Sequence, residues 1–177
     1  MNVTYRDVDL GAAADRALLA RWYNDPAIKH LFHRFVDAES FATTISPEHF
    51  ELTEEPPPSG GPCGSLMVMV DEVPVGQATF EIDTPKLVCK LPHTAWISVV
   101  VGEEPLRGRG LGTRIVAHLE ALVAQSGAER IEVGVFAYNT RSLGLFTRLG
   151  YEEFTRLPER AWFDGRRWDE VRLRKSL

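Results

Sequence analysis

The chain has 177 residues, of which 44% are hydrophobic and 25% are charged, and its net charge is −5. This composition predicts a single soluble domain over residues 1–177 with a sizeable buried core. It excludes a membrane span, because no apolar run reaches about 18 residues, and its acidic balance argues against a nucleic-acid partner. The N-terminus lacks the basic and then apolar segments of a secretory signal, so we expect a cytoplasmic protein.

The first predicted elements are a strand and a helix. Val3 and Tyr5 alternate with polar neighbours, which is typical of a short strand. Residues 10–23 carry apolar side chains at helical spacing, with Asp9 as a possible N-cap, and the Asn-Asp-Pro break at residues 24–26 ends this helix.

Two further helices and a hairpin follow. Asp37 is an N-cap candidate for a second helix, and Pro47 favours the start of a short third one. Residues 54–64 are rich in Pro and Gly and predict a surface loop, either a plain connector or a lid. The β-rich runs 66–70 and 75–82 predict an antiparallel hairpin.

The second half predicts strands at 95–101 and 130–136, a helix over 139–149 ended by Gly150, and a closing hairpin. The Asp-Gly pair at residues 164–165 marks the turn of that hairpin, between 161–163 and 167–173. The fold class is therefore α/β, with a mixed sheet of six or seven strands flanked by about four helices.

A glycine-rich basic turn separates the strand at 95–101 from a helix that runs to Gly127. The strand ends in three β-branched residues, Val99, Val100 and Val101. A helix N-terminus offers unpaired N–H groups to an anion, and glycines let phosphate oxygens approach the backbone. The turn predicted to bind phosphate consists of Arg107, Gly108, Arg109, Gly110, Leu111, Gly112 and Thr113.

Two common phosphate-binding motifs do not fit this turn. A nucleoside-triphosphate loop needs Gly-Lys-Ser or Gly-Lys-Thr, which is absent from the chain. A dinucleotide fingerprint needs Gly-x-Gly-x-x-Gly directly after the strand, and here five residues separate Val101 from Arg107. A plain surface turn rich in Gly and Arg is the remaining alternative to a phosphate site.

The cysteines and metal-ligating residue types predict no metal centre. Cys63 and Cys89 are two thiols in a domain of this size, which do not imply a disulfide framework. They also lack the clustering of a metal site. We therefore expect reduced structural cysteines and no bound metal.

The pattern Arg-x-x-Gly-x-Gly at residues 107–112 resembles the acyl-coenzyme-A pyrophosphate loop of the GNAT N-acetyltransferase superfamily. Residues 139–151 resemble the Asn-x-x-Ser/Ala…Gly-Phe/Tyr segment of the same superfamily. The tail at 162–171 and the motif at 22–26 are similar to the subgroup of ribosomal-protein N-terminal and polyamine acetyltransferases. The resemblance implies a coenzyme-binding core over about 95–151, with two splayed parallel strands at its centre.

The resemblance also implies roles for residues of this core. A backbone amide of Val99, Val100 or Val101 would stabilise the oxyanion of acetyl transfer, opposite residues 134–135. Asn139 would orient the pantetheine arm of acetyl-CoA, and Ser142 either serves a polar role near the thiol or is an ordinary helix serine. The reaction would be a direct attack by an amine, without a metal or a covalent intermediate.

Proton transfer is less clearly marked in the sequence. Phe146 occupies the position where many family members place the tyrosine that protonates the leaving thiolate. Tyr138 or Tyr151 could replace it. The base candidates are His93, Glu132 and Glu81, for each of which a structural role is the alternative.

The acceptor site is expected in the first helices. We predict that His33 and Phe35 are partly exposed beside the acceptor amine, with Asp37 and Glu39 favouring its approach in the cationic form. Trp22 and Phe32 are expected to pack the helices onto the sheet. The acceptor stays open among protein N-termini, polyamines, antibiotics and amino-acid amines. An acyl-CoA sensor is the alternative function, and the chain would be a monomer or a homodimer.

Overall fold

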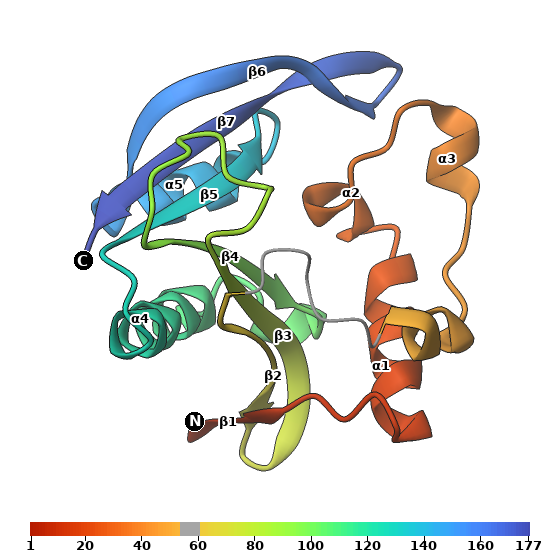
Figure 1. Cartoon of the computed structure of the whole chain (residues 1–177). Helices are drawn as coiled ribbons and strands as arrows, with labels where there is room; N and C mark the ends of the chain where they lie inside the picture. The colour runs from red at the N-terminus through yellow and green to blue at the C-terminus, as the bar shows by residue number, and fades with distance from the viewer. Residues whose placement is uncertain (54–60) are drawn as a thin grey trace.

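The computed structural model describes residues 1–53 and 61–177, and its strands form one seven-stranded sheet in the order β1-β2-β3-β4-β5-β7-β6 (Figure 1). Neighbouring strands are antiparallel except for β4 and β5, which are parallel. The strands are β1 (Val3–Asp7), β2 (Cys63–Val70), β3 (Val73–Ile82), β4 (Thr94–Val101), β5 (Arg130–Phe136), β6 (Glu152–Phe163) and β7 (Arg166–Ser176).

Helices cover both faces of this sheet. In Figure 1, α4 and α5 lie on one side of the sheet, and α1, α2 and α3 lie on the other. The predicted mixed α/β architecture is confirmed. The helices are α1 (Ala13–Asn24), α2 (Lys29–Phe32), α3 (Ala38–Ala42), α4 (Leu111–Gln125) and α5 (Thr140–Arg148), with short 3-10 turns η1 (Pro47–Thr53) and η2 (Glu104–Leu106).

The sheet separates two apolar cores. Because successive strand residues point to opposite faces, β2 contributes Val68 to one core and Met67 to the other. The larger core joins the sheet to α4 and includes Ile97, Ile115, Leu119 and Val133. The smaller core packs α1 on the opposite face through Leu19, Trp22 and Met67. Two layers of helices are thereby fixed on a single sheet.

The first helix begins later than its apolar pattern indicates. The carboxylate of Asp9 accepts hydrogen bonds from the N–H groups of Gly11 (2.9 Å) and Ala12 (3.2 Å), which form a turn before the helix. The α1 helix then starts at Ala13. Asp9 is therefore a turn residue, whereas the predicted cap Asp37 of α3 is confirmed. Asn139, which was expected inside the helix over 139–149, is the N-cap of α5.

Strand β6 is much longer than the predicted segment 161–163. It begins at Glu152 and contains Pro158, a residue that normally argues against a strand. The structure tolerates this proline because β6 is the edge strand and its pairing with β7 is interrupted between Leu157 and Ala161. The edge position and the bulge are tertiary features that local sequence does not reveal.

The structure also bears on the cysteines, on a possible membrane span and on the predicted loop 54–64. Both cysteines are free. No helix within residues 1–53 and 61–177 is long and apolar enough to cross a membrane. Of the predicted loop 54–64, residues 54–60 lie outside the described residues, and β2 begins at Cys63.

Candidate active site

The two parallel strands at the centre of the sheet separate like a fork. β4 and β5 pair only over their first three residues, and the last pair is Trp96 with Glu132. Beyond this pair, β4 stays bonded to β3 as far as Val101, and β5 stays bonded to β7 as far as Phe136. The facing edges of residues 97–101 and 133–136 therefore do not pair with each other. The predicted splay of the central strands is present in the structure.

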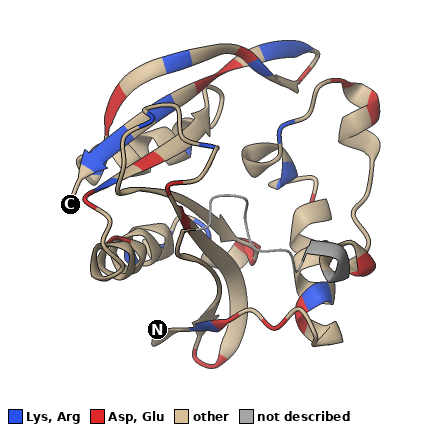
Figure 2. Cartoon of the chain, in the orientation of Figure 1, with Lys and Arg blue, Asp and Glu red and all other residues tan. Residues whose placement is uncertain are grey.

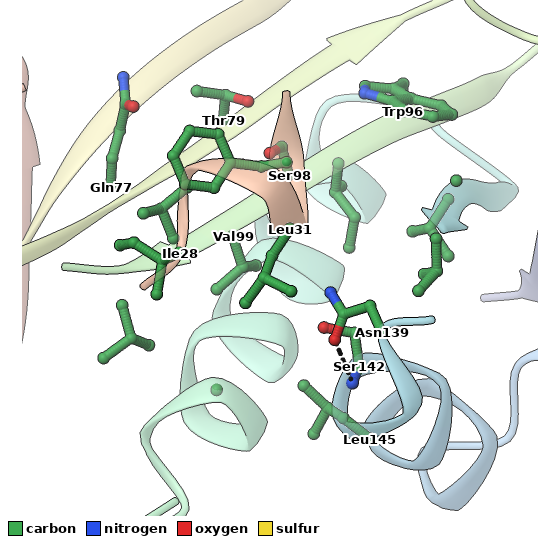
Figure 3. A pocket seen from close by; sticks show the side chains of 18 of the residues that line it. Ile28, Leu31, Gln77, Thr79, Trp96, Ser98, Val99, Asn139, Ser142 and Leu145 are labelled. Atoms are coloured by element: carbon green, nitrogen blue, oxygen red, sulfur yellow. Dashed lines mark hydrogen bonds between the residues drawn. The ribbon is translucent and has the colours of Figure 1, made fainter. Parts of the chain in front are cut away.

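A cavity of about 1030 Å³ occupies this fork. Both strands line it, together with the α4 N-terminus, α5 and the segment around α2. Figure 3 shows Gln77, Thr79 and Trp96 from the β3–β4 side, and Asn139, Ser142 and Leu145 from α5. Ile28 and Leu31 are also part of its wall. The predicted residues Val99, Val100 and Val101 all line the cavity.

The glycine-rich turn forms one end of the cavity. Gly108 and Gly110 have φ of 78° and 80°, a conformation that favours glycine, and Gly110 is the N-cap of α4. A Cβ at Gly112 would lie 3.1 Å from the side chain of Leu145 on α5, so α4 approaches α5 closely there. The predicted turn residues that line the cavity are Arg107, Gly108, Gly110, Gly112 and Thr113.

Two residues of the predicted turn do not line the cavity. Leu111 is 1% exposed and belongs to the core between α4 and the sheet. Arg109 is exposed and is not among the cavity residues. Apart from Arg107, the turn thus presents backbone and small side chains to the cavity, which suits a bulky anion.

The side chain of Arg107 is held in place by hydrogen bonds within the protein. An arginine in a glycine turn would be expected to be mobile. Its guanidinium donates to the carbonyl oxygens of Val101 (3.0 Å) and Gly102 (2.5 Å) and to the carboxylate of Asp25 (2.8 Å). The side chain is only 14% exposed. Arg107 therefore ties the end of β4 to the segment after α1, and its charge is largely used within the protein.

Asn139 and Ser142 stand together at the start of α5. The side-chain oxygen of Asn139 accepts a hydrogen bond from the backbone N–H of Ser142 at 3.1 Å, as Figure 3 shows. Both residues line the cavity, and Asn139 is 6% exposed. Since the oxygen of Asn139 caps the helix, its amide group is the part available to a ligand.

Phe146 and the two tyrosines considered as its replacements for thiolate protonation differ in position. Phe146 lines the cavity and packs edge-on against Tyr151, with ring centroids 5.0 Å apart. Tyr138 donates its hydroxyl to the carbonyl oxygen of His30 at 2.5 Å, and burial raises its pKa. Neither Tyr138 nor Tyr151 is among the cavity residues. The structure therefore brings neither hydroxyl to the fork.

The base candidates His93 and Glu132 also lie outside the cavity. His93 is exposed on the loop before β4, where its φ of 55° places it in a turn. Glu132 is 0% exposed, and its carboxylate accepts from the N–H groups of Val88 (2.9 Å) and Cys89 (3.0 Å) and pairs with Arg172 at 3.0 Å. Glu132 thus holds the loop before β4 and has no free lone pair directed at a substrate. These placements argue against both residues as bases.

Two carboxylates do line the cavity. Glu81 on β3 is the Cα partner of Trp96, and its oxygens accept from the hydroxyl of Thr84 (2.8 Å) and the ammonium of Lys86. Glu170 on β7 is 8% exposed and was not identified from the sequence. Figure 2 shows acidic and basic residues following one another along β6 and β7. The alternation of apolar Val171 and Leu173 with charged neighbours was the signal that could have identified Glu170.

The expected acceptor residues lie in three different places: one in the cavity, one buried outside it and one on the surface. His33 lines the cavity, and burial lowers its pKa, as do nearby Lys29 and His49, which favours the neutral imidazole. Phe35 is 9% exposed and packs against Phe41 with ring centroids 4.9 Å apart, so it is buried and the predicted partial exposure is wrong. It is not among the cavity residues.

Asp37 is an exposed helix cap. Its carboxylate accepts from the backbone N–H of Ser40 at 2.8 Å, and the hydroxyl of Ser40 accepts from the N–H of Asp37 at 3.1 Å. The bond from Ser40 lowers the pKa of Asp37.

Trp22 is 1% exposed and packs in the smaller core as expected, whereas Phe32 lines the cavity. Phe32 and His33 thus contribute aromatic rings to the cavity wall, and Asp37 is not among the cavity residues.

A family model described as the acetyltransferase (GNAT) family matches residues 19–151, more than half of the chain. The chain belongs to the GNAT acetyltransferase family. The matched segment includes the fork, the glycine turn and α5, and with them most of the residues that line the cavity.

Relatives of this GNAT chain include YwnH from Bacillus subtilis (strain 168), which carries the name "putative phosphinothricin acetyltransferase". The two sequences are 30% identical over 84 residues, which cover 48% of this chain and 51% of YwnH. The aligned region thus spans about half the length of that curated relative.

Solved structures share the GNAT fold over nearly the whole chain. The ribosomal-protein-alanine N-acetyltransferase of Brucella melitensis has a TM-score of 0.74 at 23% identity, with 98% of this chain and 99% of that one covered. YncA of Salmonella typhimurium, solved with its cofactor acetyl-CoA, has a TM-score of 0.72 at 22% identity, with 100% and 95% covered. At these identities the likeness shows the fold.

Proposed function

We propose that the protein transfers the acetyl group of acetyl-CoA to a primary amine, by direct attack of the amine in a ternary complex. The observation that carries this proposal is the fork between β4 and β5, which opens into the cavity beside the glycine turn at the α4 N-terminus. Unpaired strand edges can hydrogen-bond an extended amide-containing chain, and a helix N-terminus attracts phosphate. The pantetheine arm and the pyrophosphate of acetyl-CoA match these two features.

Residues of this chain have distinct parts in the proposed reaction. The free strand edge of Val99–Val101 supplies a backbone N–H for the carbonyl oxygen as negative charge develops on it. The backbone at Gly110 and Gly112 receives the pyrophosphate, and the amide of Asn139 orients the arm. Phe146, Leu145 and the valines exclude water from the thioester.

The proposed acceptor is a small-molecule or peptide amine. Gln77, Thr79 and Glu81 on β3 share a face with Trp96 and Ser98 on β4, because paired residues point to the same side of a sheet. All five line the cavity. This polar row lies on the face covered by α1 and α2 and offers acceptors and donors to an amine. The proposal includes a cytoplasmic location and a monomer or homodimer.

The second candidate function is an acyl-CoA sensor with little turnover. The observation that favours it is Phe146 in the cavity, together with the placement of Tyr138 and Tyr151 outside it. Tyr23 does line the cavity, but its hydroxyl already donates to the side-chain oxygen of Gln77 at 2.7 Å. A sensor would bind acetyl-CoA through the same loop. Only its reactivity toward amines would differ.

An amine panel separates the two functions. Purified protein is mixed with acetyl-CoA and with a peptide N-terminus, spermidine, an aminoglycoside or a free amino acid, and released coenzyme A is followed by a thiol reagent. We expect at least one amine to raise the release rate well above that of the protein-free mixture. Tight acetyl-CoA binding with no such amine would instead support the sensor.

A further inference from the structure

Glu170 brings a carboxylate to the point where the central strands separate. An ideal Cβ on Gly134 would overlap Oε1 of Glu170 and would lie 2.8 Å from Cη2 of Trp96. Gly134 is two residues beyond Glu132, the last β5 residue that pairs with β4. The carboxylate and the indole edge therefore cover the same point of β5, at the beginning of the fork. Only a residue without a side chain leaves them room there.

Glu170 lies within ion-pair distance of two arginines, one of which it shares with Glu132, but its oxygens accept no hydrogen bond from either. Nε of Arg172 lies 3.1 Å from Oε1, but this contact lacks the geometry of a hydrogen bond. Nη1 of Arg172 donates instead to Glu132 (3.0 Å) and to the carbonyl oxygen of Lys86 (3.1 Å). Arg160 lies 3.9 Å from Oε2 and is 43% exposed. Within residues 1–53 and 61–177, no donor forms a hydrogen bond to the Glu170 carboxylate.

Glu81 provides the contrast within the same cavity. Its two oxygens accept separately from the hydroxyl of Thr84 and the ammonium of Lys86, so both are used inside the protein. A carboxylate with free acceptor capacity in a largely buried position is expected to bind a cation or a proton donor. Of these two cavity carboxylates, Glu170 has the larger free capacity, because no hydrogen bond from the described residues uses its oxygens, whereas each oxygen of Glu81 already accepts one.

We propose that Glu170 is the catalytic base that receives the proton of the acceptor amine. The inference rests on the proposed acetyl transfer. The ammonium form of the acceptor would bind beside Trp96 and give one proton to the Glu170 carboxylate. The nitrogen lone pair then forms the bond to the acetyl carbonyl carbon, the carbon–sulfur bond breaks, and the thiolate leaves. The second proton of the nitrogen passes to the thiolate through water, and Glu170 returns its proton to solvent.

The test replaces Glu170 by Gln, which keeps the shape of the side chain and removes its basicity. The acceptor is the most active amine of the panel. We expect kcat/KM for this amine to fall by about 100-fold or more, within the usual range for a general base, while the Kd for acetyl-CoA stays within twofold. Glu153→Gln is the matched control, because Glu153 pairs with Arg156 at 2.6 Å on β6 outside the cavity. This control is expected to keep full activity.

Glu81→Gln distinguishes the two carboxylates of the cavity. We expect it to reduce kcat/KM by less than tenfold, because the Glu81 carboxylate already serves Thr84 and Lys86. A large loss in Glu81→Gln beside a small one in Glu170→Gln would overturn the assignment and give the role to Glu81. If the parent protein binds no acetyl-CoA or acetylates no amine, the proposed function itself fails, which is a different result.

A weakly basic acceptor amine tests whether Glu170 acts as a base or only has a structural role. Ethylamine and 2,2,2-trifluoroethylamine are similar in size, but only ethylamine is mainly protonated near neutral pH. If Glu170 takes a proton from the ammonium, the defect of Glu170→Gln should be several-fold smaller with trifluoroethylamine. Equal defects with both amines would show that Glu170 only maintains the structure. If the Gln variant does not fold, the same two amines are compared in Glu170→Asp. This variant keeps the charge but withdraws the carboxylate from the acceptor by one methylene.

Discussion

Replacing Arg172 with Met is expected to reduce the free energy of unfolding by about 3–5 kcal/mol. Arg172 is 5% exposed, and it pairs with Glu132, which is 0% exposed. Its guanidinium also lies over the indole of Trp96, 4.7 Å from the ring centroid. Without the arginine, the carboxylate of Glu132 would remain buried without a cationic partner. Urea denaturation of parent and variant measures the effect.

The double variant Glu132→Gln with Arg172→Met is the control for this prediction. It removes both charges, so it should recover part of the stability that the single Met variant loses. The N–H groups of Val88 and Cys89 would still have the amide oxygen of Gln as an acceptor. A single-variant loss below about 1 kcal/mol would contradict the account of Arg172 as the partner that makes burial of Glu132 tolerable.

Replacing Gly110 with Val is expected to raise the Kd for acetyl-CoA at least tenfold. Gly110 lines the cavity with φ of 80°, and a branched side chain would occupy the space beside the exposed N–H groups of α4. The same change also strains the backbone, since L residues avoid positive φ. Calorimetric titration of acetyl-CoA into the folded variant gives the affinity directly.

Gly127→Val is the matched control for that experiment. Gly127 follows the other end of α4, has φ of 91° and does not line the cavity. In both positions a Cβ would meet no atom within 4 Å, so the two variants are expected to suffer similar backbone strain. If Gly127→Val weakened acetyl-CoA binding as much as Gly110→Val, strain would explain the loss and the phosphate site would lie elsewhere.

Much of the coenzyme side of this site was predictable from the sequence. A β-branched run, a glycine turn and an amphipathic stretch are local patterns, and they predicted β4, the turn and α4 in the right order. Asn139 was predictable as well, because a helix cap depends on a few neighbouring residues. The role of Arg107 was less accessible, since its partner Asp25 is 82 positions away.

The residues proposed for the acceptor side could not be predicted in the same way, because their positions depend on the register between strands that are far apart in the sequence. Glu132 and Glu170 are both acidic residues on strands, and their local sequences do not distinguish them. Pairing places Glu132 opposite Trp96 in the last pair of β4 and β5. It places Glu170 opposite Phe136, and from there the carboxylate lies over Gly134 at the beginning of the fork. Phe35 likewise is covered by Phe41 and Lys29, a tertiary contact that its aromatic neighbours in the sequence did not indicate.

The most direct measurement of the central proposal is a single turnover with the enzyme in excess over acetyl-CoA. The protein, acetyl-CoA and the best amine of the panel are mixed and quenched at intervals, and mass spectrometry follows the amine, the coenzyme and the intact protein. Direct attack in the fork predicts one acetylated amine for each acetyl-CoA consumed, with the protein mass unchanged at every time. Acetylated protein that forms before the product and then decays would contradict the account, as would loss of acetyl-CoA without acetylated amine.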